Sequence, residues 1–137
     1  MKIEEAITLA IENVIKEGLD DIYPSAFEVE LLKDIDFRQK IFDSTIPKLK
    51  KTSLDEMEFM PLQYSYFPKK EAFDFRKAAL IQPWDVIKYL SLVLLCTEEI
   101  ETKRIPVNLN TVFSYRYNPK NGLLFDQNYV YQLLQKI

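Results

Sequence analysis

The chain has 137 residues, of which 47% are hydrophobic and 28% are charged, and its formal net charge is −3. This length and composition indicate one globular domain with its own core and exclude wholesale disorder. The acidic balance gives no overall sign of nucleic-acid binding, so any binding of phosphate must come from a local basic patch.

The chain contains no histidine and a single cysteine, Cys96. The lack of histidine removes the commonest general base, the commonest metal ligand and every Ser–His or Cys–His nucleophile. Cys96 ends the apolar run 90–96, which predicts a buried and inert thiol. Because no apolar run is long enough to span a bilayer and the start lacks a signal-peptide pattern, we expect a cytoplasmic protein without membrane contact.

Residues 3–17 form the clearest predicted helix. Gly18 fits the left-handed position after its last turn, and Leu19 can then fold back on Val14. We interpret its apolar stripe as core packing, with a partner-binding face as the alternative. The stripe repeats at spacings of three and four and consists of Ile3, Ala6, Ile7, Ala10, Ile11, Val14 and Ile15.

Two further helices are expected before a polar connection over 52–60. One begins at Ser25, because Ser25 and Glu28 match a capping box. The other spans about 36–45 and should end or bend at Pro47. The side chains expected to face inward are Phe27, Leu31, Leu32, Phe37, Ile41 and Phe42.

The hydrophobic period changes to two after residue 61. Residues 62–67 alternate as a strand does, a loop over Lys69–Asp74 follows, and residues 75–81 offer a returning strand. The sequence therefore predicts an antiparallel β-hairpin, although its loop lacks the usual glycine.

A long helix is expected over 84–99, with Pro83 in its first turn. It is apolar on most sides, which is typical of the centre of a core or of a helix that packs on another chain. Residues 112–117 are aromatic and strand-like, and 129–134 suggest a short C-terminal helix. We predict an α+β fold over 1–137: one helix-rich domain with a small antiparallel hairpin.

The hairpin concentrates positive charge. Lys69 and Arg76 on its two arms form a compact pair that suits a phosphate, because an ammonium and a guanidinium can grip different oxygens of one group. Arg76 and Lys77 should point to opposite faces, so Arg76 is the better partner for Lys69. The alternative is a solvated hairpin tip, partly neutralised by Glu71 and Asp74.

Asp85 lies in the first turn of the 84–99 helix, where it can cap free N–H groups and oppose the positive end of the helix dipole. It can also orient Arg116, a lone charge among aromatic residues, if the two elements meet. Structural pairing is the leading interpretation of Arg116, with stacking or a nucleic-acid backbone contact as alternatives. The remaining carboxylates fall at expected helix ends and loops and predict no metal site.

The ordered set Pro68-Lys69 … Arg76 … Pro83-Trp84-Asp85 … Val112-Phe113-Ser114-Tyr115-Arg116 resembles the N-terminal fingers region of bacterial reverse transcriptases. The most similar members are the divergent group related to abortive infection and phage defence. The resemblance covers roughly 60–130, while residues 1–51 resemble only the helical leader of such proteins.

The resemblance implies that Lys69 and Arg76 contact the triphosphate of an incoming nucleotide. It implies structural or template-facing roles for Lys70, Asp85 and Arg116. The family's palm aspartates have no counterpart in this chain, so Mg²⁺ is expected only with a palm domain. We therefore expect a fingers-like part of an RNA-directed DNA polymerase relative, which binds nucleotide phosphate or template backbone and is not catalytic alone.

The alternative is a small helical interaction or oligomerisation domain without a nucleic-acid role. Its interface would be the apolar helix over 84–95 and the aromatic stretch over 112–117. Under either hypothesis we expect self-association or a palm-containing partner, because a missing palm leaves an apolar face uncovered.

Overall fold

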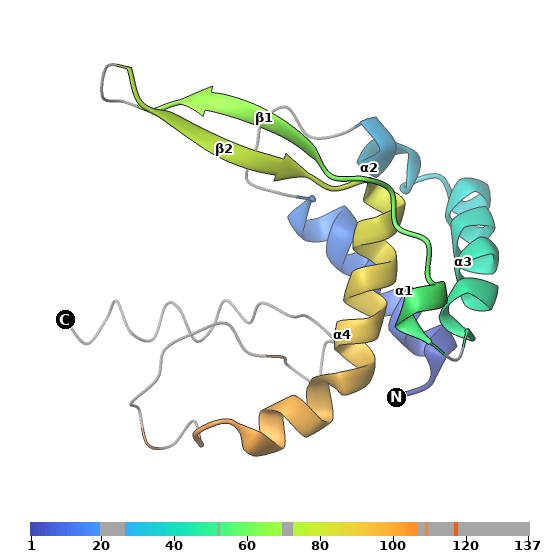
Figure 1. The fold of residues 1–137 in the computed structure, drawn as a ribbon. Coiled ribbons are helices and arrows are strands. Elements are labelled where there is room, and N and C mark those ends of the chain that lie inside the picture. The colour runs from blue at the N-terminus through green and yellow to red at the C-terminus, as the bar shows by residue number, and fades with distance from the viewer. Residues whose placement is uncertain (20–26, 52, 70–72, 107–108, 110–116, 118–137) are drawn as a thin grey trace.

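Helices build the body of the molecule, and an antiparallel hairpin projects from one end of it (Figure 1). The structure is a computed structural model that describes residues 1–19, 27–51, 53–69, 73–106, 109 and 117. Its elements are α1 (Ile3–Glu17), α2 (Phe27–Leu31), α3 (Ile35–Leu49), the 3₁₀ turn η1 (Leu54–Glu56), β1 (Gln63–Pro68), β2 (Phe75–Leu80) and α4 (Pro83–Lys103). The predicted α+β class, helix-rich with one small hairpin, is confirmed.

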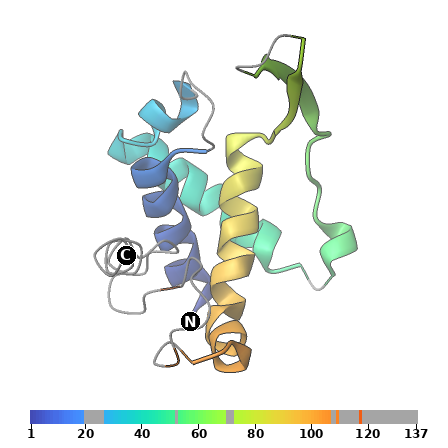
Figure 2. The same ribbon diagram turned by 90° about the vertical axis from the view of Figure 1, so that its left-hand side faces the viewer.

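The core lies where α1 packs along α4, with α3 against both helices (Figure 2). The predicted stripe of α1 supplies half of it, since Ile7, Ile11 and Val14 are fully or almost fully buried. Core packing of α1 is thus confirmed. Gly18 has the positive φ expected of it (81°), but its ψ of −168° lies outside the left-handed helical region.

The short helix α2 and the turn after it bury Leu32 as predicted, but the inward side of α2 carries Val29 and not Phe27. Val29 and the following Leu32 are buried, whereas Phe27 is exposed. Successive helical residues are about 100° apart, so a residue two positions from Val29 faces nearly the opposite way. The inward placement of Phe27 was therefore wrong, and the capping residue Ser25 lies outside the described residues.

Helix α3 starts as its sequence indicates and ends later. The Asp34 carboxylate accepts a hydrogen bond from the Phe37 N–H (2.8 Å) and caps the first turn. Pro47 was expected to end or bend the helix near 45, but the helix continues to Leu49. Leu49 is buried in the core, and its burial stabilises the last turn enough to tolerate the proline.

The hairpin forms as predicted, and each strand limit lies within one residue of the expected position. β1 and β2 pair in register from Gln63↔Leu80 to Pro68↔Phe75. The strands pack mainly on each other, and within the described residues no side chain of 61–81 joins the helical core. We call residues 61–82 the hairpin arm.

Helix α4 begins at Pro83 as predicted and runs four residues beyond the expected end, to Lys103. Its buried side includes Ile87, Ser91 and Leu94, so the helix has one core face and is not enclosed all round. Cys96 follows Leu94 by two positions and is exposed. The expectation of a buried thiol was therefore wrong, for the same angular reason as Phe27.

The C-terminal predictions fall largely outside the described residues. The strand-like stretch over 112–117 is described only at Tyr117, which packs against the core, and the helix over 129–134 is not described. Among the described helices, none combines the length and the apolar character needed to cross a membrane.

Candidate functional site

Lys69 and Arg76 lie on the same face of the hairpin arm. Arg76 stands opposite Phe67 in the ladder, and the Lys69 N–H bonds to the Asp74 carbonyl (2.9 Å), which extends the register by one pair. Lys69 and Arg76 are therefore diagonal neighbours, a relation in which residues of an antiparallel pair are about 7–8 Å apart. Two long cationic side chains at this separation can reach one phosphate group.

The carboxylate of Asp74 already engages Lys69. Its Oδ2 lies 2.6 Å from the Lys69 Nζ, and both side chains are about half exposed. An exposed pair of this kind contributes little to stability. Its effect on binding is larger, because the carboxylate holds one of the three ammonium donors and repels any incoming phosphate.

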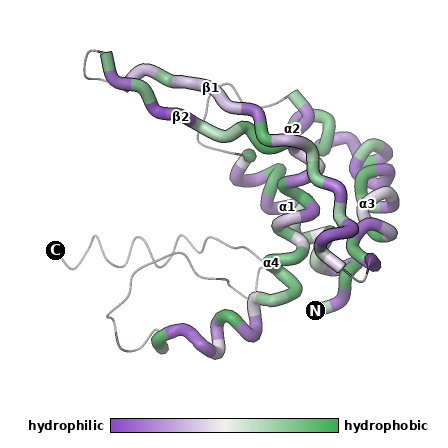
Figure 3. The backbone as a smooth tube through the Cα atoms, in the orientation of Figure 1, coloured by the Kyte–Doolittle hydropathy of each residue, from purple (hydrophilic) through white to green (hydrophobic). Residues whose placement is uncertain are grey.

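The arm carries a charge opposite to that of the rest of the chain. Its sequence holds four cations and two carboxylates, a net charge of +2, whereas the whole chain carries −3 and the remainder therefore carries −5. Figure 3 shows hydrophilic residues on β2 toward the tip. This separation of charge favours an anionic ligand at the arm over one at the helical body.

The other face of the arm is aromatic. Tyr64, Tyr66 and Phe75 are 53%, 64% and 57% exposed. Lys77 lies on the same face with its Nζ 3.9 Å from the centre of the Tyr64 ring, a cation–π contact. Arg76 and Lys77 thus point to opposite faces, as the strand period requires.

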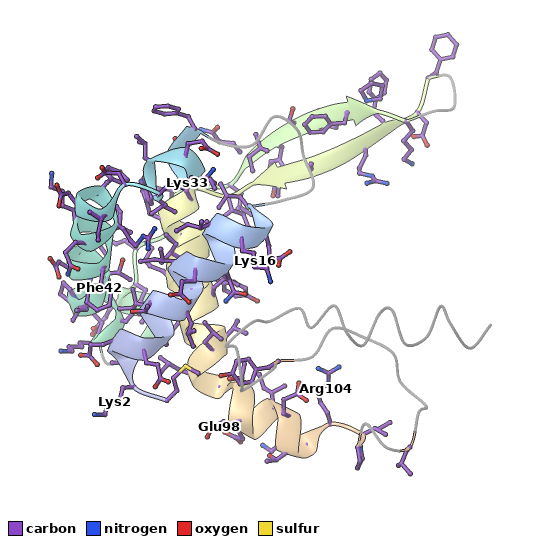
Figure 4. All side chains as sticks on the ribbon, turned by 180° about the vertical axis from the view of Figure 1, so that it is seen from behind. Lys2, Lys16, Lys33, Phe42, Glu98 and Arg104 are labelled. Carbon is purple, nitrogen blue, oxygen red and sulfur yellow. The ribbon has the colours of Figure 1, made fainter. Side chains whose placement is uncertain are left out.

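Phe73 stands at the tip of the arm, where the sequence lacks a glycine. Its φ is +68°, a left-handed value that is strained for a bulky residue, and its side chain is 99% exposed. The chain therefore places a costly conformation and a large apolar ring beyond the paired part of the two strands. Figure 4 shows side chains standing out on both sides of the arm, well away from the helices.

Asp85 and Lys88, in the first turns of α4, hold residues 58–60, the segment that leads into the arm. Asp85 Oδ1 pairs with Lys88 Nζ at 2.5 Å, and Asp85 Oδ2 accepts a hydrogen bond from the Met60 N–H at 2.7 Å. Lys88 also donates to the Glu58 carbonyl (2.5 Å) and lies 4.6 Å from the centre of the Phe59 ring. The segment that leads into β1 is therefore held against the helix that follows β2.

This arrangement corrects one expectation for Asp85, the capping of free N–H groups at the start of α4. Both of its carboxylate oxygens are used by Lys88 and by the Met60 N–H, not by the free N–H groups at the start of α4. Sequence reasoning missed Lys88 altogether. Its spacing of three from Asp85 on a predicted helix was the available signal, but such spacing is common on solvated helix faces as well.

The remaining predicted residues are not brought into this site by the described structure. Lys70 and Arg116 lie outside the described residues, so neither their contacts nor the suggested link between Asp85 and Arg116 can be placed. Within the described ranges, no three His, Cys, Asp or Glu side chains gather as a metal site would need.

A groove of about 290 Å³ lies between α1 and α3. It is lined by Thr8, Ile11, Glu12, Ile35, Arg38, Gln39 and Phe42, none of which the sequence marked as functional. Arg38 at its edge is occupied by a hydrogen bond from its Nε to the Leu32 carbonyl (3.0 Å). The groove therefore offers little chemistry beside that of the arm.

Comparison of the chain with protein-family models, with curated protein sequences and with solved structures finds no match in any of the three.

Proposed function

We propose that the hairpin arm binds the phosphate of a nucleotide or of a template strand through Lys69 and Arg76, as the fingers of a reverse-transcriptase-related protein. The observation that carries the proposal is their position as diagonal neighbours on one face of the arm. The net charge of +2 on the arm supports it, since the rest of the chain is acidic and repels the same ligand.

Arg76 is the main phosphate ligand in this proposal. Its guanidinium offers a planar fork to phosphate oxygens, and among the described residues it has no carboxylate partner within ion-pair distance. Lys69 joins it by exchanging part of its contact with Asp74. Asp85 and Lys88 support binding because they attach the segment before β1 to α4 and so hold the arm in one direction relative to that helix.

Binding alone is proposed for this chain, because polymerisation needs palm aspartates that hold Mg²⁺. We place the arm beside a palm-containing partner or domain, in the cytoplasm, where a template and nucleoside triphosphates are available. The polymerase-related role depends on the sequence resemblance, whereas the binding of phosphate depends also on the geometry of the arm.

The test is titration of a fluorescent nucleoside triphosphate and of a labelled single-stranded oligonucleotide, followed by anisotropy at several salt concentrations. Arg76→Ala and Lys69→Ala should each weaken binding about tenfold and flatten its salt dependence, since each removes one charged contact. Lys103→Ala is the matched control, because Lys103 also pairs with a carboxylate at 2.6 Å, that of Glu99, at the far end of α4 (Figure 1). Equal effects of all three substitutions, or no binding at low salt, would reject the proposal.

The alternative function, an interaction or oligomerisation domain, was based on the apolar surface of α4, and little of that surface is free. Most of the apolar side chains of α4 pack within the chain, with Ile87 and Leu94 fully buried and Leu92 and Leu95 half-buried. The exposed part of its surface includes Tyr89, which is 60% exposed. A protein interface on α4 would therefore have to use its exposed apolar side chains, which include Tyr89 and Ile100.

A further inference from the structure

The aromatic face of the arm is not explained by phosphate binding. Lys69 and Arg76 lie on one face, whereas Tyr66 and Phe75 lie on the other and are more than half exposed. Large aromatic side chains that gather on one exposed sheet face are unusual unless a ligand covers them. A two-stranded hairpin is also only marginally stable alone, so covering this face would stabilise the arm.

The spacing of the aromatic rings suits stacked bases. Tyr66 stands opposite Lys77, and Phe75 stands opposite Pro68, which makes Tyr66 and Phe75 diagonal neighbours. Diagonal neighbours are about 7–8 Å apart, roughly twice the rise of about 3.4 Å per nucleotide along one strand. The two rings can therefore take alternate bases of a single strand. Lys77, whose Nζ lies over the Tyr64 ring on the same face, can pair with a phosphate next to these bases.

Charge and aromatic character together favour a nucleic acid as the occupant. The arm carries a net charge of +2, so two copies of the arm repel each other, and an apolar protein partner would gain nothing from its cations. Aromatic rings interleaved with cations are the surface that single-stranded nucleic acids bind, whereas the bases of a duplex are already stacked and out of reach.

We infer that the face formed by Tyr64, Tyr66, Phe75 and Lys77 stacks unpaired bases of a single-stranded nucleic acid. The inference rests on the proposed function, because a strand that meets Arg76 and Lys69 on one face of the arm passes around its edge to reach the aromatic face. It adds a preference that phosphate contacts alone do not give, namely for single strands with bases over duplexes and over strands without bases.

The test compares three labelled ligands of one length, by anisotropy at fixed salt: a single-stranded oligonucleotide, its abasic analogue and its duplex. Tyr66→Leu and Phe75→Leu retain apolar bulk without a stacking ring and should weaken binding of the single strand about tenfold each. They should leave the abasic strand unaffected. Arg76→Ala should weaken all three ligands, and Phe27→Leu, which changes an exposed aromatic residue on the helical body, should weaken none.

The outcomes separate this inference from the proposed function. Loss of binding with Arg76→Ala but not with the two leucine variants retains the phosphate site and overturns base stacking. Loss with the leucine variants but not with Arg76→Ala retains stacking and overturns the phosphate site. Equal binding of the single strand, the abasic strand and the duplex also overturns the stacking inference.

A second measurement guards against a variant that does not fold. Phe75→Trp retains an aromatic ring, and stacking on a base should quench its fluorescence when the single strand is added but not when the abasic strand is added. No quenching by a saturating single strand overturns the inference. The inference is also overturned if the protein binds no oligonucleotide but its mass in solution rises with concentration and Tyr66→Leu abolishes this rise. That result assigns the face to a second copy of the chain.

Discussion

Lys88 lies one turn after Asp85 on α4, and the two side chains form a buried ion pair. Only 7% of the Lys88 side chain and 5% of the Asp85 side chain are exposed. The same two side chains hold the backbone of Glu58 and Met60, 30 and 25 residues earlier in the chain. The pair therefore joins the entry of the hairpin arm to the helix at its exit. This relationship sets the direction in which the arm projects.

Replacing Lys88 with Met should destabilise the fold strongly. The substitution leaves the Asp85 carboxylate buried without its cation, and removing one partner of a buried pair costs about 3–5 kcal/mol. We expect urea unfolding to show a loss of that size, or a chain that no longer folds. Lys103→Met, which breaks the exposed pair with Glu99, is the control and should leave the free energy of unfolding nearly unchanged. A loss below about 1 kcal/mol for Lys88→Met would contradict the role given to the pair.

Replacing Asp74 with Asn should strengthen phosphate binding. It removes the carboxylate 2.6 Å from Lys69 and raises the net charge of the arm from +2 to +3. We expect a several-fold lower dissociation constant for a triphosphate and a steeper dependence on salt. The control is Glu99→Gln, which raises the net charge of the chain equally but far from the arm. If both variants bind alike, the effect is one of overall charge, and Lys69 has no part in the site.

Replacing Phe73 with Gly should stabilise the tip of the arm. Glycine adopts the φ of +68° freely, which relieves about 1–2 kcal/mol of strain and outweighs the extra entropy that glycine loses on folding. Amide exchange at Lys69, whose N–H bonds to the Asp74 carbonyl, should slow several-fold. Phe73→Ala removes the same ring but keeps the Cβ, so it should not slow exchange. Equal effects of the two variants would show that the ring and not the backbone is responsible.

Tyr117 should make the fold sensitive to alkaline pH. Burial, together with the nearby carboxylates of Glu5 and Glu98, raises the pKa of Tyr117 above its ordinary value of 10.0. The unfolded chain then loses this proton at a lower pH than the folded chain does. The stability contribution is therefore complete below about pH 10 and is lost as pH rises through the folded pKa.

Tyr117→Phe removes this ionisation and should reduce the fall in the free energy of unfolding between about pH 9 and pH 11. Glu98→Gln removes one of the two nearby charges and should have a smaller effect in the same direction. Urea unfolding at several pH values measures both. A pH dependence identical to that of the original protein in Tyr117→Phe would contradict the assignment.

Self-association through α4 is tested at Tyr89 and not at Leu94. Leu94 is 1% exposed, so a charge placed there should unfold the protein whatever its state of assembly. Tyr89→Glu should leave the free energy of unfolding nearly unchanged and should lower the mass in solution if α4 forms an interface. A protein that is monomeric at every concentration, with or without this substitution, rejects the interface hypothesis.

Part of the candidate site could be predicted because it depends on local rules. The loop limits at Lys69 and Asp74, and the opposite faces of Arg76 and Lys77, follow from the period of two along a strand. The salt bridge between Lys69 and Asp74 was also among the possibilities, since both residues close the same loop. The aromatic face was harder to interpret, because alternation shows that a face exists and does not show what covers it.

The sequence by itself determined the elements of this protein: the apolar stripe of α1, the hairpin, and the start of α4 at Pro83. These depend on periodicity and on local backbone preference, which neighbouring residues carry. Only the tertiary structure decided that Asp85 and Lys88 are buried together, that Phe27 and Cys96 face outward, and that Tyr66 and Phe75 remain exposed. Burial depends on which elements meet, and contacts between residues such as Met60 and Asp85 span 25 positions that no local pattern connects.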